Sequence, residues 1–397
     1  MLMDKAATLV IGGGASGISA AISARRKGDS VLICEKLPQL GKKLLISGNG
    51  RCNLLNEDLS ESHYNERARR LVKSVFSRFG KDDIVDFFND LGLEIYARDG
   101  RVFPMTNQAP SVLKVLEMEL ARLSVASDFG FEAVSITDSE GGFVVRSKAG
   151  LLRKADKVII ACGGKSYPAL GSDGSSYVLA GQFGHRAVGP VPSAVPLVVK
   201  NNLCHVLQGQ KIFAAVRSLI VGKVAAEASG EVLFTKYGLS GTAILDISES
   251  VSIAVNRHRK KDVVVAVDLA PFMDKEELGF ELARRRGKNY SAHEFFAGIL
   301  PNKFGPVFAD LALKGQVDDM VMGLKDKRFA VAGTRGWNEA EFTSGGIEVN
   351  EVNEGTLESK LKKGIYFAGE ALDVGGVRGG YHLAWAWASG FAAGLAR

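Results

Sequence analysis

The opening of the chain alternates short apolar runs with a segment of helical periodicity. Thr8–Ile11 and Val31–Cys34 have the length and the apolar character of β-strands. Between them, residues 16–27 place small and apolar side chains at helical spacing. This order predicts a β-α-β unit at the N-terminus.

The turn between the first strand and the helix is rich in glycine, and the second strand ends in an acid. Gly12 supports the tight turn, Gly14 has no Cβ to keep a pyrophosphate off the backbone, and Gly17 allows close helix–sheet packing. The first amides of the helix then face the phosphate. Glu35, 18 residues past Gly17, can accept hydrogen bonds from a ribose. Together these features predict that a dinucleotide is bound here.

The hydrophobic pattern continues with helices and strands up to about residue 189. Helical periodicity predicts three helices, near residues 71–79, 84–91 and 112–120. Strand-type runs at 133–137 and 143–147 flank Gly141-Gly142 and predict a β-hairpin. Residues 158–161 predict a strand that ends in Cys162-Gly163-Gly164, where the backbone can approach a ligand closely.

The character of the chain changes after Gly189, which indicates an inserted domain at 190–340. Its first part, about 190–270, is β-rich, with a turn expected at Ser229-Gly230. Its second part, about 271–328, is helical, and capping-box patterns predict two of its helix starts, at Asp274/Glu277 and Ser291/Glu294. Residues 1–189 and 341–397 would then form one domain from two segments.

The last segment repeats the design of the first. A strand near 364–367 runs into Gly369-Glu370, and Gly379-Gly380 precede a helix of small residues at 381–396. Such an arrangement offers a carboxylate to sugar hydroxyls and helix amides to an electron-rich ring edge.

Composition narrows the class of protein. With 397 residues, 46% hydrophobic and 24% charged, the chain is expected to form two or three soluble domains. No signal peptide and no membrane-spanning stretch is recognisable, so we expect a cytoplasmic protein without a membrane partner. Four widely spaced cysteines, with no CxxC pair and no Cys/His cluster, indicate neither a disulfide framework nor a metal site.

The net charge of +6 raises the question of nucleic-acid binding. Most of the excess lies in Arg257–Lys261 and Arg284–Lys288. We favour a solvated face, because aromatic residues are not interleaved with these charges as they are in single-strand platforms. An RNA-associated protein that binds through the basic region 257–288 remains an alternative.

These motifs together resemble the FAD-binding domain of glutathione-reductase-type flavoproteins. The run Gly41–Asn53 is more specific, and it is similar to a bacterial family of NAD(P)/FAD-dependent oxidoreductases often called aminoacetone-oxidase-like FAD-binding proteins. Arg101–Pro104, Thr343–Gly346 and Gly379–Gly390 match the same family. The resemblance implies an α/β fold: a discontinuous, doubly wound Rossmann-like FAD domain with an inserted β-barrel-like and helical domain.

The resemblance also implies which residues hold the non-covalent FAD. These are Gly12, Gly14, Ala15, Ser16, Gly17, Glu35, Lys36, Gly41, Lys42, Lys43, Ser47, Gly48, Asn49, Gly50, Arg51, Cys52, Asn53, Cys162, Gly163, Gly164, Gly369, Glu370, Gly379, Gly380 and Tyr381. The chain departs from the family pattern at Lys236, Thr242, His382 and Ala384, which leaves the substrate open.

A flavin carries the electrons itself, so no nucleophile or metal is required. His382 is the best candidate for a catalytic acid or base, with helix packing as the alternative. For Cys52 we favour a small buried thiol over a redox partner. No second GxGxxG follows a strand, so NAD(P)H would act only as a transient electron donor.

The sequence therefore predicts an FAD-dependent oxidoreductase that moves hydride or electrons between a small molecule or NAD(P)H and an unidentified acceptor. An amine or aminoketone oxidase that uses O2 and the RNA-associated flavoprotein are the alternatives. The oligomeric state is open.

Overall fold

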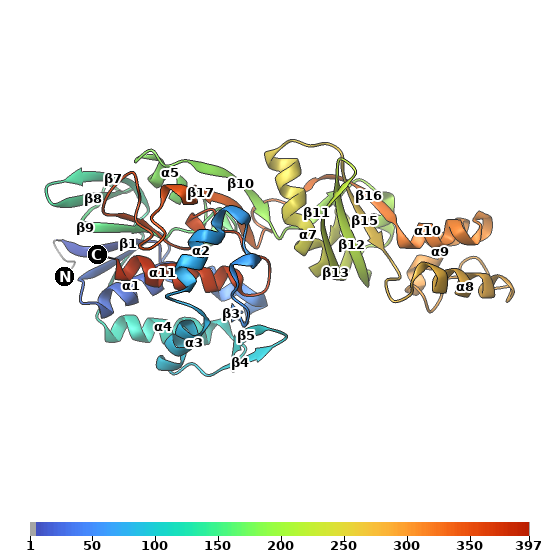
Figure 1. The fold of residues 1–397 in the computed structure, drawn as a ribbon, viewed down its shortest axis with the longest axis horizontal. Coiled ribbons are helices and arrows are strands. Elements are labelled where there is room, and N and C mark those ends of the chain that lie inside the picture. The colour runs from blue at the N-terminus through green and yellow to red at the C-terminus, as the bar shows by residue number, and fades with distance from the viewer. Residues whose placement is uncertain (1–4, 397) are drawn as a thin grey trace. The chain divides into compact units, whose positions relative to one another are not determined.

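The computed structural model describes residues 5–396, which form two compact units (Figure 1). Unit 1 contains the chain up to Pro190 and again from Phe342, and unit 2 is Val191–Glu341. Each unit has its own hydrophobic core.

A seven-stranded sheet forms the centre of unit 1. Its strands are β1 (Ala6–Ile11), β2 (Val31–Glu35), β6 (Ala126–Phe129), β7 (Ala133–Ser139), β8 (Gly142–Ser147), β9 (Leu152–Ile160) and β18 (Ile365–Phe367). The order is β6-β2-β1-β9-β8-β7, and β18 pairs with the end of β9. All pairs among β6, β2, β1, β9 and β18 are parallel, and Val10 lies opposite both Ile33 and Ile159. The carboxyl ends of these strands therefore meet at one edge of the sheet.

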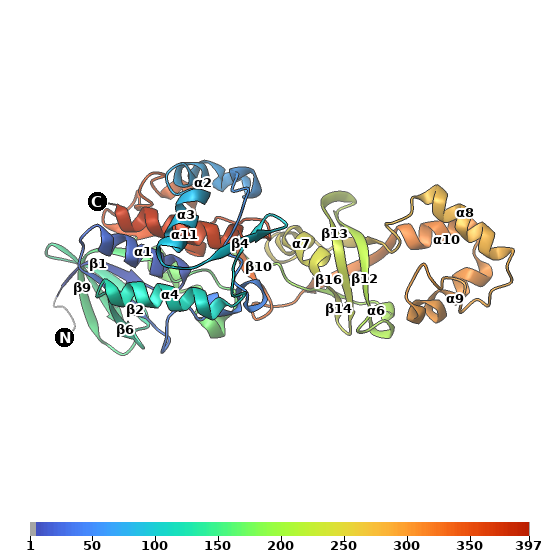
Figure 2. The same cartoon turned by 90° about the horizontal axis from the view of Figure 1, so that it is seen from below.

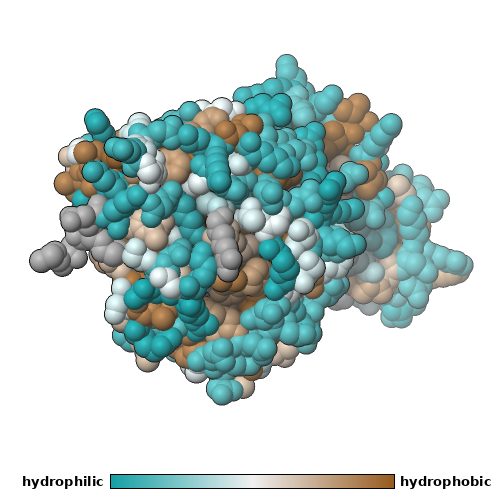
Figure 3. All heavy atoms as spheres, turned by 60° about the vertical axis from the view of Figure 1, so that its left-hand side comes forward, coloured by the Kyte–Doolittle hydropathy of each residue, from teal (hydrophilic) through white to brown (hydrophobic). Residues whose placement is uncertain are grey.

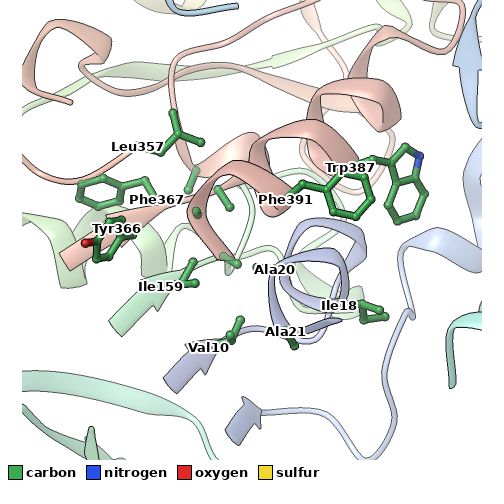
Figure 4. Packing of buried hydrophobic residues seen from close by; sticks show 14 of the residues in the cluster. Val10, Ile18, Ala20, Ala21, Ile159, Leu357, Tyr366, Phe367, Trp387 and Phe391 are labelled. Carbon is green, nitrogen blue, oxygen red and sulfur yellow. The ribbon is translucent and has the colours of Figure 1, made fainter. Parts of the chain in front are cut away.

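Helices and two small sheets complete unit 1. The helices are α1 (Ala15–Arg26), α2 (Arg69–Phe76), α3 (Lys81–Asp90), α4 (Ala109–Arg122), α5 (Ser175–Gly181) and α11 (Tyr381–Leu395), with the 3-10 segment η1 (Leu44–Gly50). One small sheet contains β3 (Leu55–Asn56), β5 (Arg101–Pro104) and β4 (Ile95–Arg98). The other pairs β17 (Phe342–Ile347) with β10 (Ala187–Ser193), which begins in unit 1 and ends just past its boundary at Pro190. Figure 4 shows the core, with Val10, Ile159 and Phe367 of the sheet near Ala20 of α1 and Phe391 of α11.

Helices α1 and α11 pack side by side, as both ribbon views show (Figures 1 and 2). The hydroxyl of Ser19 donates to the carbonyl of Ala386 (3.4 Å), and that of Ser23 to the carbonyl of Phe391 (3.1 Å). Contacts thus advance along both helices in the same direction, so the helices are parallel. A Cβ at Gly390 would lie 2.5 Å from the carbonyl oxygen of Ser16, which shows how close the backbones are.

Unit 2 contains a closed antiparallel barrel and a group of helices (Figure 1). The barrel order is β11 (Leu197–Val199), β14 (Gly238–Ser240), β13 (Lys223–Thr235), β12 (Lys211–Ile220), β15 (Val263–Asp268) and β16 (Lys327–Thr334). Helix α7 (Thr242–Ser252) packs on it, and the other helices are α6 (Asn202–Val206), α8 (Lys275–Arg286), α9 (Gly305–Lys314) and α10 (Val317–Lys325). The predicted fold class, a Rossmann-like α/β domain with a barrel-like and helical insertion, is confirmed.

Two local predictions in the insertion were wrong. Ser229-Gly230 lies inside β13, and the hairpin turns at Val221-Gly222, where φ is +51° and +74° as a type I′ turn requires.

Residues 291–300 form turns rather than the second capped helix that was predicted. The guanidinium of Arg285 donates hydrogen bonds to the carbonyls of Phe295 and Ala297, and Gly298 has a φ of +79°. These two carbonyls bind a side chain, and the glycine adopts a φ that right-handed helical backbone does not have.

The α1–α11 contact yields a stability prediction. Gly390→Ala places a Cβ against Ser19 and the Ser16 carbonyl, so we expect a loss of about 1–3 kcal/mol from overpacking. The matched control is Gly181→Ala, because a Cβ there meets nothing within 4 Å. Urea unfolding of both variants measures the difference. A Gly390→Ala protein as stable as the control would show that the two helices can separate at little cost.

Candidate cofactor site

Helices α1 and α11 both begin without a cap. Gly14 is the N-cap of α1 and Gly380 that of α11; neither helix has a side-chain cap bond or an acid in its first turn. Because the helices are parallel, their positive ends lie on the same side of unit 1. The first-turn amides of both helices, which no side chain caps, therefore favour an anion and an electron-rich group there.

The glycines of the first turn differ in what surrounds them. Gly12 has a φ of +104°, and a Cβ there would lie 2.6 Å from the Ala161 carbonyl oxygen. A Cβ at Gly17 would meet the Gly12 carbonyl. At Gly14, by contrast, a Cβ would meet nothing within 4 Å. The first two glycines are required by the fold itself, and Gly14 leaves open room at the helix start, as a pyrophosphate site needs.

Glu35 is buried at the end of β2 and shapes the same turn. Its two carboxylate oxygens accept hydrogen bonds from the amides of Gly13 (2.6 Å) and Leu37 (2.8 Å). The next residue, Lys36, forms a 2.7 Å ion pair with Asp173. Glu35 thus holds the glycine turn in addition to the ribose contact that the sequence predicts for it.

A hollow of about 260 Å³ is lined in part by Asp173. Its walls include the apolar side chains of Val134, Val178 and Leu179. An apolar wall next to charged groups suits an aromatic base with polar edges.

The segment 41–53 is tied to the glycine turn, because the amide of Gly41 donates to the carbonyl of Gly13 (2.8 Å). The amide of Cys52 donates to the carbonyl of Ser47 (3.0 Å), which closes the loop on itself. Burial raises the pKa of Cys52 to about 12. A thiol that stays protonated fits the interpretation of Cys52 as a buried side chain rather than a redox partner.

Glu370 is the centre of a polar cluster built from four distant segments. Its Oε2 accepts from the ammonium of Lys43 (2.6 Å), and its Oε1 from the amide of Thr343 (2.6 Å) and the hydroxyl of Ser166 (3.3 Å). Lys43 also donates to Ser166 (2.6 Å). Burial alone would raise the pKa of the Glu370 carboxyl, but the charges of Lys43 and His382 hold it below its usual range.

The other predicted glycines near this cluster serve the packing of the chain. A Cβ at Gly164 would lie 2.5 Å from the Thr343 hydroxyl, and one at Gly369 would lie 2.5 Å from the Ser16 hydroxyl. The second contact places the Gly369-Glu370 turn against the first turn of α1. Burial also raises the pKa of Cys162, to about 11.

The start of α11 is held by the small β3–β5 sheet. The carbonyl of Gly379 accepts from the Asn56 side-chain amide (3.0 Å), and a Cβ at Gly380 would lie 2.5 Å from the Leu55 carbonyl oxygen. The glycine at 380 is therefore needed by this contact, whatever the cofactor requires.

His382 lies in the first turn of α11 with its ring in a fixed position. Its Nε2 donates to the carbonyl of Gly376 (2.7 Å), since a carbonyl can only accept. The ring stacks on Phe342 with centroids 3.8 Å apart. An oriented histidine near Glu370 is compatible with both the catalytic and the packing interpretation.

Ser166 and Thr343 are the members of the Glu370 cluster absent from the predicted site. Thr343 belongs to the Thr343–Gly346 run that matches the family, but this match did not assign it a role in the site. Ser166 follows the Gly163-Gly164 turn but belongs to no motif that the sequence analysis recognises. Its position next to Lys43 and Glu370 depends on tertiary structure alone.

A sheet whose central strands are parallel, with a glycine turn open at Gly14 and two uncapped helix starts facing one side, is typical of a dinucleotide-binding Rossmann-type domain. The family model described as "HI0933-like protein Rossmann domain" matches residues 6–396. The chain therefore belongs to the HI0933-like family and is an FAD-dependent oxidoreductase.

Named relatives extend over nearly the whole chain. A 3-dehydro-bile acid delta(4,6)-reductase from Clostridium scindens is 39% identical over 402 residues, 98% of each chain. A ribosomal RNA dihydrouridine synthase from Escherichia coli K12 is 30% identical over 406 residues, 98% of this chain and 97% of the relative. A flavocytochrome c3 fumarate reductase structure shares the fold, with a TM-score of 0.50 and 17% identity over 99% of this chain and 78% of that chain.

The surface agrees with a chain whose apolar residues are mostly buried. The face in Figure 3 is largely hydrophilic, with hydrophobic residues in small separate patches. Among residues 5–396, no helix is long and apolar enough to cross a membrane.

The open space at Gly14 gives a direct test of cofactor binding. Gly14 has a φ of −81°, so Gly14→Val should leave the apoprotein folded and abolish FAD binding, because the valine fills the space for the phosphate. Gly12→Val is the matched control and should destabilise the apoprotein. Flavin titration and thermal unfolding measure both effects.

Denaturing the wild-type protein should release unmodified FAD. Release of FMN, or unchanged FAD affinity in Gly14→Val, would contradict this assignment of the turn.

Proposed function

We propose that the protein reduces carbon–carbon double bonds that are conjugated with a carbonyl group in a small polycyclic molecule of the 3-oxo bile acid type. The observation that carries the proposal is the 39% identity to a 3-dehydro-bile acid delta(4,6)-reductase across 98% of both chains. The name of the other relative, a ribosomal RNA dihydrouridine synthase, implies a similar reaction on a different molecule. Dihydrouridine is uridine with two hydrogens added across a ring double bond that is conjugated with a carbonyl, and 3-dehydro-delta(4,6) names a conjugated ketone.

Such a reduction adds a hydride to one carbon and a proton to its neighbour. FAD, when bound and reduced, supplies the hydride. The chain must hold the cofactor, orient the substrate and provide the proton. Uncapped amides of α1 would hold the pyrophosphate, and those of α11 would stabilise negative charge at the ring edge.

His382 is the residue that we propose for the proton. It belongs to the first turn of α11, and its ring is oriented by Phe342 and the Gly376 carbonyl. A histidine can donate a proton near neutral pH because its reference pKa is about 6.5.

The contacts of the basic residues in unit 2 support a small molecule over RNA. Arg284 and Arg285 both bond to Glu281 of the same helix, at 2.8 and 2.7 Å. Arg285 also donates to carbonyls of the 291–300 segment, and Arg286 to a carbonyl that precedes α10. This cluster therefore ties the helical part together, although Arg284, Arg286 and Lys288 remain exposed, and residues 258–261 form a second exposed basic run.

The first experiment mixes anaerobically reduced protein with a 3-oxo-4,6-diene bile acid and follows flavin absorbance. We expect rapid reoxidation and a product heavier by two hydrogens per turnover. NADH and NADPH are compared as donors for the reductive half-reaction. A reduced flavin that persists with the steroid contradicts the proposal.

Two further measurements would identify the alternative functions, an RNA-associated flavoprotein and an amine or aminoketone oxidase. Reoxidation by undermodified ribosomal RNA, with binding that weakens as salt rises, would favour the RNA-associated flavoprotein. Reduction of the oxidised flavin by an amine or aminoketone, followed by O2 consumption, would favour an oxidase.

The second experiment tests His382. If it donates the proton, His382→Asn should slow substrate reduction by about 10²-fold and remove from the rate profile the pH dependence that this side chain causes. His205→Asn, at an exposed position on α6, is the matched control. Rapid-mixing kinetics from pH 5.5 to 9 give both profiles. Identical profiles for wild type and His382→Asn would assign this ring to packing.

A further inference from the structure

The β4–β5 hairpin fixes the backbone position of Arg101. Asp99 and Gly100 form its turn, with φ of +52° and +73° as a type I′ turn requires, and β5 begins at Arg101. Strand β5 also pairs with β3, where Asn56 lies opposite Arg101. Hydrogen-bonded strands on both sides therefore hold this residue in place.

The side chain of Arg101 lies against the turn that precedes α11. A Cβ at Gly379 would lie 3.8 Å from the Nε of Arg101 and 3.6 Å from the side-chain nitrogen of Asn56. Asn56 donates to the carbonyl of Gly379 (3.0 Å), which ties the small sheet to the start of α11. The electron-rich ring edge of the cofactor is expected at this helix start. A substrate that reacts at the ring therefore has to come close to Arg101.

Arg101 differs from two neighbouring cationic side chains because no acidic group neutralises it. Arg98, opposite Arg101 in the hairpin, forms an ion pair with Asp99 (3.7 Å). The ring of His63 bonds to the carboxylate of Asp58 (2.8 Å). Arg101 is exposed, and within residues 5–396 its side chain forms no hydrogen bond and no ion pair. The five N–H donors of its guanidinium are therefore available to a ligand.

The proposed reduction produces a negative charge that such a donor can stabilise. When a hydride adds to the far carbon of the conjugated double bonds, the π electrons move onto the carbonyl oxygen. This oxygen carries the charge until a proton is bonded to the carbon next to the one that accepted the hydride, and the carbonyl is then restored. A fixed cationic donor at this oxygen stabilises the transition state more than the neutral substrate.

We propose that Arg101 binds the carbonyl oxygen of the substrate and stabilises the negative charge that forms there during hydride addition. This role rests on the proposed function and makes Arg101 a catalytic residue in addition to His382, which supplies the proton. A carbonyl oxygen only accepts hydrogen bonds and a guanidinium only donates them, so the two groups are complementary.

The test uses a steroid whose first ring is a phenol, because its ionised oxygen resembles the charged oxygen of the reaction. Holoenzyme with oxidised FAD is titrated with this steroid, and the ligand absorbance reports the ionised fraction at each pH. Free phenols ionise near about pH 10. In the wild type the bound phenol should ionise about one pH unit lower or more, since a nearby opposite charge lowers a pKa by about 1–3 units. Arg101→Met should remove most of this shift.

Controls separate this role from a structural one. Arg101→Lys keeps the charge and should retain part of the shift, and Arg98→Met, at an exposed position of the same hairpin, should retain all of it. Thermal unfolding and flavin absorbance report folding and FAD content. The proposal is overturned by equal ionisation midpoints in wild type and Arg101→Met, or by a phenol that does not bind. An effect confined to the flavin reduction potential would assign Arg101 to the cofactor and overturn it as well. If Arg101→Met loses FAD, the wild type decides: a bound phenol that ionises no more readily than the free phenol overturns the proposal.

Turnover separates this role from the proposed function. With the 3-oxo-4,6-diene bile acid, Arg101→Met should slow reoxidation of the reduced flavin by about 10²-fold. A wild-type protein that leaves this steroid unreduced contradicts the proposed function alone, because the phenol measurement does not depend on turnover.

Discussion

The close parallel packing of α1 against α11 is the constraint on which the site of unit 1 depends. Parallel helices place like ends of their dipoles together, which is unfavourable unless both ends are compensated. At the carboxyl ends, Lys27 and Lys157 donate to the carbonyl of Ala396, at 2.8 and 2.7 Å. The two ammonium groups lie close together, and burial and the charge of Lys27 lower the pKa of Lys157 to about 8. At the amino ends, Gly14 and Gly380 leave the amides for an anionic cofactor.

This packing also explains how one site arises from the two ends of a chain. The first segment supplies the glycine turn and Lys43, and the last supplies Glu370 and the start of α11. Strand β18 returns to the sheet beside β9, which brings Glu370 within 2.6 Å of Lys43 although unit 2 lies between them in the sequence. A large insertion is compatible with the site because each contact of Glu370 is made inside unit 1.

The parts that could be predicted from the sequence are those governed by local rules. The β-α-β unit follows from periodicity, and Gly12, Gly14 and Gly17 follow from a turn with few solutions. The prediction failed where tertiary contacts override a local pattern: Arg285 donates to the Phe295 carbonyl, and the Ile299 amide, which a helix would pair with that carbonyl, donates to the carbonyl of Phe296. Ser166 was missed for a related reason, because its role exists only next to Lys43 and Glu370.

The helix-dipole charges of α1 and α11 are compensated differently at their amino and carboxyl ends. This difference links cofactor binding to the stability of the protein. The lysines at the carboxyl ends belong to the chain and are present in the apoprotein. The partner expected at the amino ends is the ligand, because no side chain of the protein caps either helix start. A ligand that binds only the folded state stabilises it by RT ln(1 + [L]/Kd). Stabilisation by FAD should therefore depend on both segments of unit 1, because α1 and α11 come from its first and last segments and pack against each other.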